Sequence, residues 1–329
     1  MDAINFVGLV LLTEYVIRWK PDFLLSGLLY LLLAEVFINF LTILLFPNGL
    51  YSTEYFSNNY FLGYDNQNIN VLLPTLVLAI TRYKYKLPYS RPILIVTLFL
   101  VLYTVLVIFS GASLVIVSLT MLLSLPFLCE MSTICNGWNY LIINVMMFFS
   151  IVIFRLQNLF SFIIVDMLGK DLTLTGRTFI WKRVNDFIKR NPILGYGVES
   201  QAYRSAKMKL KSYYGNQISS SLNSFAGLHA HNRFLETAYR GGVILTVIYC
   251  AILIISAKQL YKNKDAVIAK MMSIGMFVYL TGMLTEFYRY SYLFFPLLLM
   301  AECSAEIDGM IERKYGKMTN ICSVLTFIQ

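Results

Sequence analysis

Long apolar runs recur along nearly the whole chain and are separated, with one exception, by short polar connections. At about 20 residues for each membrane-crossing helix, this pattern predicts an all-α, polytopic transmembrane helix bundle of about nine spans. The first and third runs are short, so we expect tilted, re-entrant or differently bounded helices there. The runs cover residues 3–17, 23–46, 69–81, 92–109, 112–129, 139–154, 234–257, 266–285 and 288–303.

The exception is the polar stretch 155–233, which divides the chain into transmembrane helices (1–154), one large loop (155–233), further transmembrane helices (234–303) and a tail (304–329). Within the loop, residues 177–190 carry apolar positions at helical spacing, and Asn191-Pro192 follows as a stop signal. We expect an amphipathic helix there that lies on the membrane or on the bundle, followed by a tight turn over 191–197.

Composition agrees with a membrane protein, because 58% of the residues are hydrophobic and 14% are charged. The formal net charge is +9, and the loop 155–233 holds twelve Lys or Arg against four acids. A basic surface at a membrane indicates lipid phosphates or an anionic substrate, and we expect no nucleic acid partner for a loop flanked by spans.

The short connections sort by charge. Lys and Arg lie at 18–20, 82–91, 258–264 and 313–317, whereas the connection 47–68 has neither. The positive-inside rule places the first set in the cytoplasm and the N-terminus outside. The large loop is then extracytoplasmic, since long translocated loops escape that rule.

Both histidines of the chain, His229 and His231, lie at the end of this loop. A histidine at a membrane–water boundary is a candidate general base, and a structural pair at a helix start is the alternative. A metal site would need further ligands, and Glu236 is the only obvious one nearby, so we expect no metal site. Arg177, at the start of the amphipathic helix, fits phosphate oxygens or, alternatively, a headgroup anchor.

Charged residues beside or within spans are costly and therefore candidates for function. Glu236 and Arg240 are spaced to pair with each other on one helix face. Arg155, at the outer end of the sixth run, is expected to face the same vestibule as His231. Glu286 and Arg289 flank the outer turn before the last run.

The sequence has no Walker loop, no dinucleotide-binding glycine pattern and no paired acidic motif for a metal–nucleotide sugar, so we expect no cofactor. The five cysteines are expected to be free, because most lie in or beside apolar segments.

Three segments of the loop resemble a known family. They are Gly176–Trp181 (GRTFIW), Asn191–Gly197 (NPILGYG) and the segment from His231-Asn232 through Glu236 to Gly242. This ordered set is similar to the bacterial O-antigen ligase and capsular polysaccharide polymerase family, in which a G-R-x-x-x-W helix, a P-x-L-G-x-G turn and an H-N-x-x-L-E segment lie on one large outer loop.

The resemblance implies a C-type glycosyltransferase of the bacterial plasma membrane that acts without metal on a glycan linked to undecaprenyl diphosphate. His231 would be the base or orient the acceptor, and Arg177 would bind the diphosphate as it leaves. Asn232 and Glu236 would support His231 or bind sugar. A flippase and a chain-length regulator would be partners, alongside membrane lipid. Arg155, Trp181, Tyr196 and Arg289 complete the expected substrate-binding set.

One departure bears on the reaction. The ligases carry an arginine beside a serine at an earlier outer helix end, where this chain has Ser110-Gly111-Ala112-Ser113. Arg155 or Arg289 would then supply that charge. The departure favours a polymerase of O-antigen, capsule or exopolysaccharide over a ligase.

A transporter or flippase of lipid-linked sugars is the alternative from another class, and Glu35 and Arg289 support it. The single large loop has no counterpart in the first half of the chain, which argues against a transporter built from paired halves.

Overall fold

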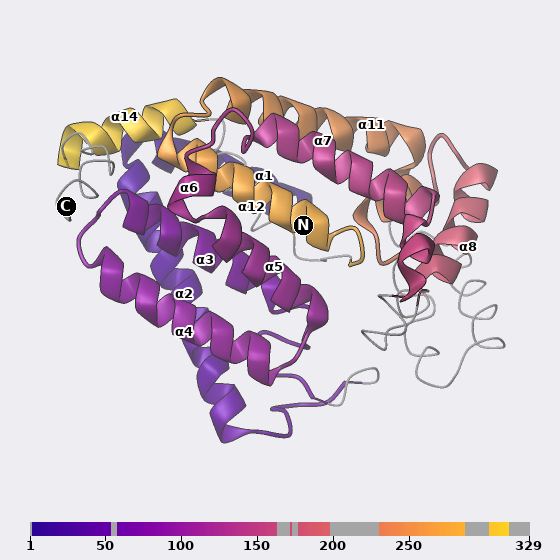
Figure 1. Ribbon diagram of the computed structural model, residues 1–329, viewed down its shortest axis with the longest axis horizontal. Coiled ribbons are helices and arrows are strands. Elements are labelled where there is room, and N and C mark those ends of the chain that lie inside the picture. Colours follow the sequence, from indigo (N-terminus) through magenta and orange to yellow (C-terminus); the bar gives the residue numbers. More distant parts are fainter. Residues whose placement is uncertain are drawn as a thin grey trace.

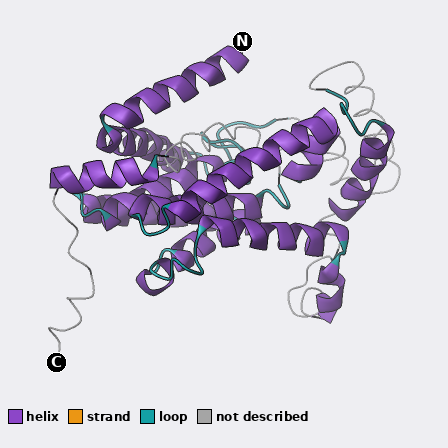
Figure 2. Ribbon diagram, turned by 90° about the horizontal axis from the view of Figure 1, so that it is seen from above, coloured by secondary structure: helices purple, strands orange, loops and turns teal. Residues whose placement is uncertain are grey.

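The computed structural model describes residues 2–53, 58–162, 172, 177–197, 230–286 and 303–315. These ranges are helical, apart from connecting turns and two isolated β-bridges, Tyr51 with Asn59 and Tyr60 with Gly63 (Figure 2). The all-α prediction is therefore confirmed for the part of the chain that is described.

Among the described residues, most helices coincide with the predicted apolar runs, and the others lie in the polar loop and the tail. The helices are α1 (Asp2–Trp19), α2 (Pro21–Leu45), α3 (Ile69–Lys84), α4 (Ser90–Val107), α5 (Gly111–Leu123), α6 (Pro126–Cys129), α7 (Gly137–Phe148), the π-helix η1 (Phe149–Ile153), the 3-10 helix η2 (Leu156–Phe160), α8 (Arg177–Arg190), α11 (Arg233–Lys262), α12 (Val267–Gly282) and α14 (Ser304–Tyr315).

One predicted span, residues 112–129, is wrong because it is not a single continuous helix. In this run α5 ends at Leu123 and the short α6 begins at Pro126. Proline lacks a backbone N–H and its ring excludes the preceding turn of a helix, so a new helix starts there instead. Most of the run 288–303, which would be the last span, lies outside the described residues.

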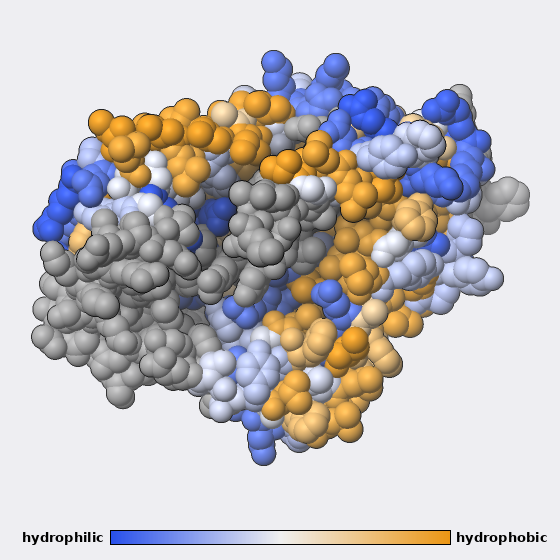
Figure 3. Space-filling model, turned by 180° about the vertical axis from the view of Figure 1, so that it is seen from behind, coloured by the Kyte–Doolittle hydropathy of each residue, from blue (hydrophilic) through white to orange (hydrophobic). Residues whose placement is uncertain are grey.

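Within the described residues, three helices are long and apolar enough to cross a membrane, namely Pro21–Leu45, Ser90–Val107 and Arg233–Lys262. The segments Gly111–Leu123, Gly137–Ile153 and Val267–Gly282 are apolar but shorter. Large apolar side chains remain exposed on the long helices, such as Leu45 on α2 and Val247 on α11. Figure 3 shows broad hydrophobic areas on the face opposite to that of Figure 1. These features support a membrane location, and the count of nine spans stays a prediction.

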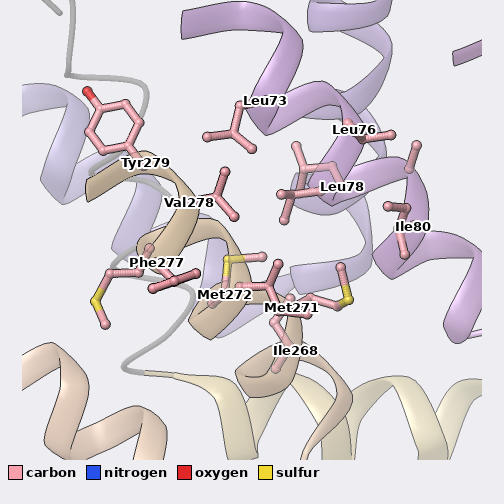
Figure 4. Packing of buried hydrophobic residues seen from close by; sticks show 14 of the residues in the cluster. Leu73, Leu76, Leu78, Ile80, Ile268, Met271, Met272, Phe277, Val278 and Tyr279 are labelled. Atoms are coloured by element: carbon pink, nitrogen blue, oxygen red, sulfur yellow. The ribbon is translucent and has the colours of Figure 1, made fainter. Parts of the chain in front are cut away.

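The core of the bundle forms where α3 packs against α12, and both helices are buried along most of their length. Figure 4 shows Leu73 of α3 beside Val278 of α12, and Leu76, Met271 and Met272 belong to the same buried cluster. A helix that is apolar on all sides lies either inside a packed core or in a membrane, and α3 and α12 lie in the packed centre of the bundle.

The two ends of the bundle differ. α8 lies at one end, where α11 begins and α12 ends, and α14 lies at the other end (Figure 1). We call these the α8 end and the α14 end. At the α8 end a second, smaller apolar cluster joins α8 to the first turns of α11 through Ile180, Trp181, Val184, Leu235 and Tyr239. The expected amphipathic helix 177–190 is confirmed, and it rests on the bundle through this cluster.

Candidate functional site

Glu286 is the centre of a charged cluster at the α8 end. It follows the C-terminus of α12, where its backbone N–H donates to the Gly282 carbonyl at 3.0 Å. One carboxylate oxygen pairs with the guanidinium of Arg177, the first residue of α8. The other lies 3.4 Å from Nδ1 of His231. A single buried carboxylate thus joins residues from three separate segments of the chain.

The cluster keeps this carboxylate ionised. Burial raises the pKa of Glu286, but the hydrogen bond to His231 and the positive charge of Arg177 outweigh it, so the pKa lies below its usual value of 4.5. An ionised Glu286 accepts hydrogen bonds only, which favours a proton on Nδ1 of His231. The second ring nitrogen, Nε2, is then an acceptor suited to a general base.

The connection before α3 adds a polar layer to Glu286. Asn66 donates through Nδ2 to the carboxylate oxygen that Arg177 also contacts, at 3.0 Å, and accepts from the Ser110 hydroxyl at 2.6 Å. Ser110 also caps α5 by accepting from the N–H of Ser113 at 3.3 Å. The starts of α3 and α5 are therefore tied to the cluster through Asn66.

The charges of Glu286 and Arg177 also act on two nearby residues, Asp65 and Tyr64. Burial, together with the negative charge of Glu286, raises the pKa of Asp65 and of Tyr64 above their usual values, and Arg177 partly offsets this. Both shifts favour the protonated, neutral forms of Asp65 and Tyr64 beside the ionised Glu286.

The turn that carries His231 is held on two sides. On the first side, the indole N–H of Trp181 donates to the Ala230 carbonyl at 3.0 Å, and the Ala230 N–H donates to Glu236 at 2.7 Å. His231 itself has a left-handed backbone with φ +47°. Such a conformation is costly for a residue other than glycine and persists where the surroundings impose it.

On the second side, the end of α12 holds the turn. Asn232 caps α11 by accepting from the Leu235 N–H at 3.0 Å, and its amide donates to the Leu284 carbonyl at 2.8 Å. The Arg233 N–H donates to the Met283 carbonyl at 3.0 Å. The same turn that presents Glu286 therefore also fixes the position of His231.

The turn after α8 docks onto a kink in α11. Gly242 has φ +61° and ψ −157°, which breaks the helical geometry inside α11. Val243 donates to the Pro192 carbonyl at 2.8 Å, and Tyr196 donates to the Tyr239 carbonyl at 3.0 Å. The Gly197 N–H completes the contact by donating to the Arg240 carbonyl at 2.7 Å. The tight turn 191–197 expected from the sequence is confirmed, and Gly242 explains how it fits.

The structure brings the two expected catalytic residues, Arg177 and His231, together at Glu286. Arg155 is exposed, has a left-handed backbone, and donates to the Thr178 carbonyl at 3.4 Å, one residue from Arg177. Arg289, like His229, lies outside the described residues.

Three of the expected substrate-binding residues, Trp181, Asn232 and Glu236, are each at most 1% exposed and hold the His231 turn. Support of His231 was one of the two roles expected for Asn232 and Glu236. Glu236 also forms the expected pair with Arg240, at 2.7 Å. Tyr196 is half-buried, and its ring lies tilted against the ring of Tyr239, with the ring centres 5.2 Å apart.

Sequence reasoning missed Asn66 and underrated Glu286. Glu286 had one signal, an isolated carboxylate directly after an apolar run. Asn66 had none, because it lies in a polar connection with several other amides.

A family model described as O-antigen ligase matches residues 71–250, which is more than half of the chain. The exopolysaccharide production protein ExoQ of Rhizobium meliloti (strain 1021) is 30% identical over 95 residues, which is 28% of this chain and 20% of that protein. The aligned part thus spans about a fifth of the relative's length. The chain belongs to the O-antigen ligase family.

Proposed function

We propose that this protein polymerises undecaprenyl-diphosphate-linked oligosaccharide repeat units into a surface polysaccharide at the outer face of the plasma membrane. The observation that carries the proposal is the bridge formed by Glu286, which holds a guanidinium and an imidazole at one site. These two groups are what transfer from a lipid diphosphate needs: a cation for the leaving group and a base for the acceptor.

The reaction balances with the groups present. An acceptor hydroxyl attacks the anomeric carbon of the lipid-linked sugar and gives its proton to Nε2 of His231. The new glycosidic bond forms as the bond between the anomeric carbon and the diphosphate oxygen breaks. The electron pair leaves with the lipid diphosphate, which becomes more negative, and Glu286 stabilises the imidazolium that forms on His231.

Arg177 suits the leaving group because negative charge develops on the diphosphate as the bond breaks. Its side chain is 22% exposed while it is paired with Glu286, so part of the guanidinium reaches solvent. A guanidinium can bind a phosphate with two parallel hydrogen bonds. Arg155 donates a hydrogen bond to the carbonyl of Thr178, the residue that follows Arg177, and so adds a second cation beside the same helix start.

Two observations favour a polymerase over a ligase. The outer start of α5 has no arginine after Ser110, whose hydroxyl is committed to Asn66. In addition, the relative in Rhizobium meliloti is described as an exopolysaccharide production protein. Transfer of the glycan to a different acceptor, as a ligase would do, is the alternative outcome.

The test is reconstitution of the purified protein in liposomes with a lipid-diphosphate-linked oligosaccharide. We expect a ladder of longer lipid-linked glycans from the wild type, and a fall in rate of at least about 100-fold for His231→Ala and for Arg177→Gln. Lys189→Gln is the matched control, because it removes an exposed cation from the same helix α8. Unchanged ladders in either site variant, at normal thermal stability, would overturn the assignment. Product that forms only when a separate acceptor is supplied would indicate a ligase.

A further inference from the structure

A cavity of about 830 Å³ opens at the α14 end of the bundle, away from the cluster around Glu286. Its walls come from the C-terminal end of α3, the turn that follows, the first two turns of α4 and the connection from α5 to α6. α3 is 16 residues long, about 24 Å at 1.5 Å per residue, and separates this cavity from Asn66. The volume lies within the range of about 300–1,000 Å³ that small-ligand sites occupy.

The lining divides into a cationic part and an apolar part. Lys84, Lys86 and Arg91 supply three cations, against the single carboxylate of Glu130. The aromatic residues at this level, Tyr83 and Tyr89, are exposed. Tyrosine beside lysine and arginine is the composition of a membrane–water interface, where lipid headgroups lie.

The apolar part extends down a candidate span. Leu94 and Leu98 lie one turn apart on α4, whose 18 residues are long and apolar enough to cross a membrane, and Met121 and Leu125 face the same space. Leu98 is eight residues below Ser90, the first residue of α4, which corresponds to about 12 Å along the helix. A water-soluble anion would gain nothing from these side chains, whereas a lipid tail would contact them.

The turn between α3 and α4 is fixed in shape. The buried Arg82 donates to the Ser26 hydroxyl and, at 2.8 Å, to the Pro88 carbonyl. Lys86 and Tyr89 both have a left-handed backbone, with φ +52° and +58°. Strained residues held by buried contacts are typical of preorganised binding sites, and here they set the position of the cations.

We propose that this cavity binds an anionic phospholipid of the surrounding bilayer. The phosphate lies among Lys84, Lys86 and Arg91, and an acyl chain follows Leu94 and Leu98 into the membrane. Basic pockets between transmembrane helices are a known way in which membrane proteins select anionic headgroups. The proposal is independent of the reaction at the α8 end.

The test is native mass spectrometry of the full-length protein, incubated with phosphatidylglycerol or phosphatidylcholine carrying identical acyl chains. We expect the wild type to retain phosphatidylglycerol at least about fivefold more, and Lys84→Gln/Lys86→Gln/Arg91→Gln to reduce that retention about tenfold. The matched control is Lys258→Gln/Lys262→Gln/Lys264→Gln, which removes three cations from the same end of the bundle outside the cavity. We expect it to retain the lipid.

A second variant separates the cavity from the basic surface. Leu98→Trp fills the apolar part and leaves every charge in place, and we expect it to lower phosphatidylglycerol retention as well. Equal retention of the two lipids by the wild type would overturn the proposal, as would an equal loss in the control triple variant. Full competition by glycerol phosphate would indicate a site for a soluble phosphate and would also overturn it.

Discussion

Two packed regions of this molecule are stabilised in different ways. The α3–α12 core is a continuous apolar contact in which nearly every side chain along both helices is buried. The smaller cluster between α8 and α11 buries few apolar residues and is completed by directional bonds, from Trp181 to Ala230 and from Asn232 to Leu284. Apolar packing tolerates small shifts, whereas a hydrogen bond or an ion pair fails when its partner moves by an ångström.

This difference indicates a division of work. The core determines whether the protein folds, and the small cluster determines where Arg177, His231 and Glu286 lie relative to one another. Substitutions in the two regions should therefore separate stability from activity, and the largest separation is expected at the charged cluster itself.

Glu286→Gln is the sharpest test of that separation. The change keeps the shape of the side chain but removes the negative charge that faces Arg177 and His231. We expect kcat/KM for glycan polymerisation to fall about 100- to 1,000-fold, because the base loses the charge that stabilises its protonated form. Arg177 is partly exposed and stays hydrated, so we expect only a small fall in the thermal midpoint at pH 7.

The control for this variant is Glu14→Gln, which removes the carboxylate from an exposed pair with Arg18 far from the cluster. We expect wild-type activity there, since exposed ion pairs contribute little. Full activity in Glu286→Gln would show that Arg177 and His231 work independently of their shared carboxylate.

Gly242→Ala should damage the small cluster with less effect on the core. The backbone of Gly242 lies in a region that is essentially restricted to glycine, and an added Cβ would overlap the Ile193 carbonyl. We expect docking of the turn 191–197 to weaken by about 3 kcal/mol. Hydrogen exchange measured at Tyr196 and Gly197 should quicken while that of α12 stays slow. Gly275→Ala, in the core at ordinary contact distance from Val77, is the matched glycine control.

Leu76→Ala tests the other side of the comparison. Leu76 of α3 is fully buried in the core cluster, and the substitution leaves a cavity. Lipid is as apolar as leucine, so the loss is mainly one of packing, and we expect about 2 kcal/mol in the free energy of unfolding. Activity per folded molecule should stay near the wild-type value. A change in kcat without a change in thermal stability would contradict the division between core and cluster.

The sequence predicted the parts of this arrangement that have local signals. Helix 177–190 was bounded correctly because its apolar spacing and the Asn191-Pro192 stop are both local. Arg177 and His231 came from motifs on one loop, within residues 71–250 that the family model covers.

The connection of Arg177 and His231 to Glu286 and Asn66 could not be predicted from such local signals. These two residues are 220 positions apart, both lie outside the range that the family model matches, and they meet only because α3 packs beside α12. The break between α5 and α6 was missed for a different reason, since hydrophobicity continues unbroken through Leu125 and the single Pro126 decides the geometry.

The smallest expected effect is the pH dependence of stability. The pKa of Glu286 is lowered in the folded protein, so its ionisation stabilises the fold above about pH 4.5, and this contribution is lost as the pH falls through the lowered pKa. The pKa of Asp65 is raised, so the pH dependence is reversed: its protonated form stabilises the fold below about pH 3.8, and this stability is lost as the pH rises through the raised pKa. We expect Asp65→Asn to raise the thermal midpoint at pH 7. The thermal midpoint of Glu286→Gln should lie slightly below that of the wild type at pH 7 and approach it only below pH 4.5. Parallel pH curves for the three proteins would mean that neither carboxylate senses the charges around it, and the cluster would then be a packing contact instead of an electrostatic one.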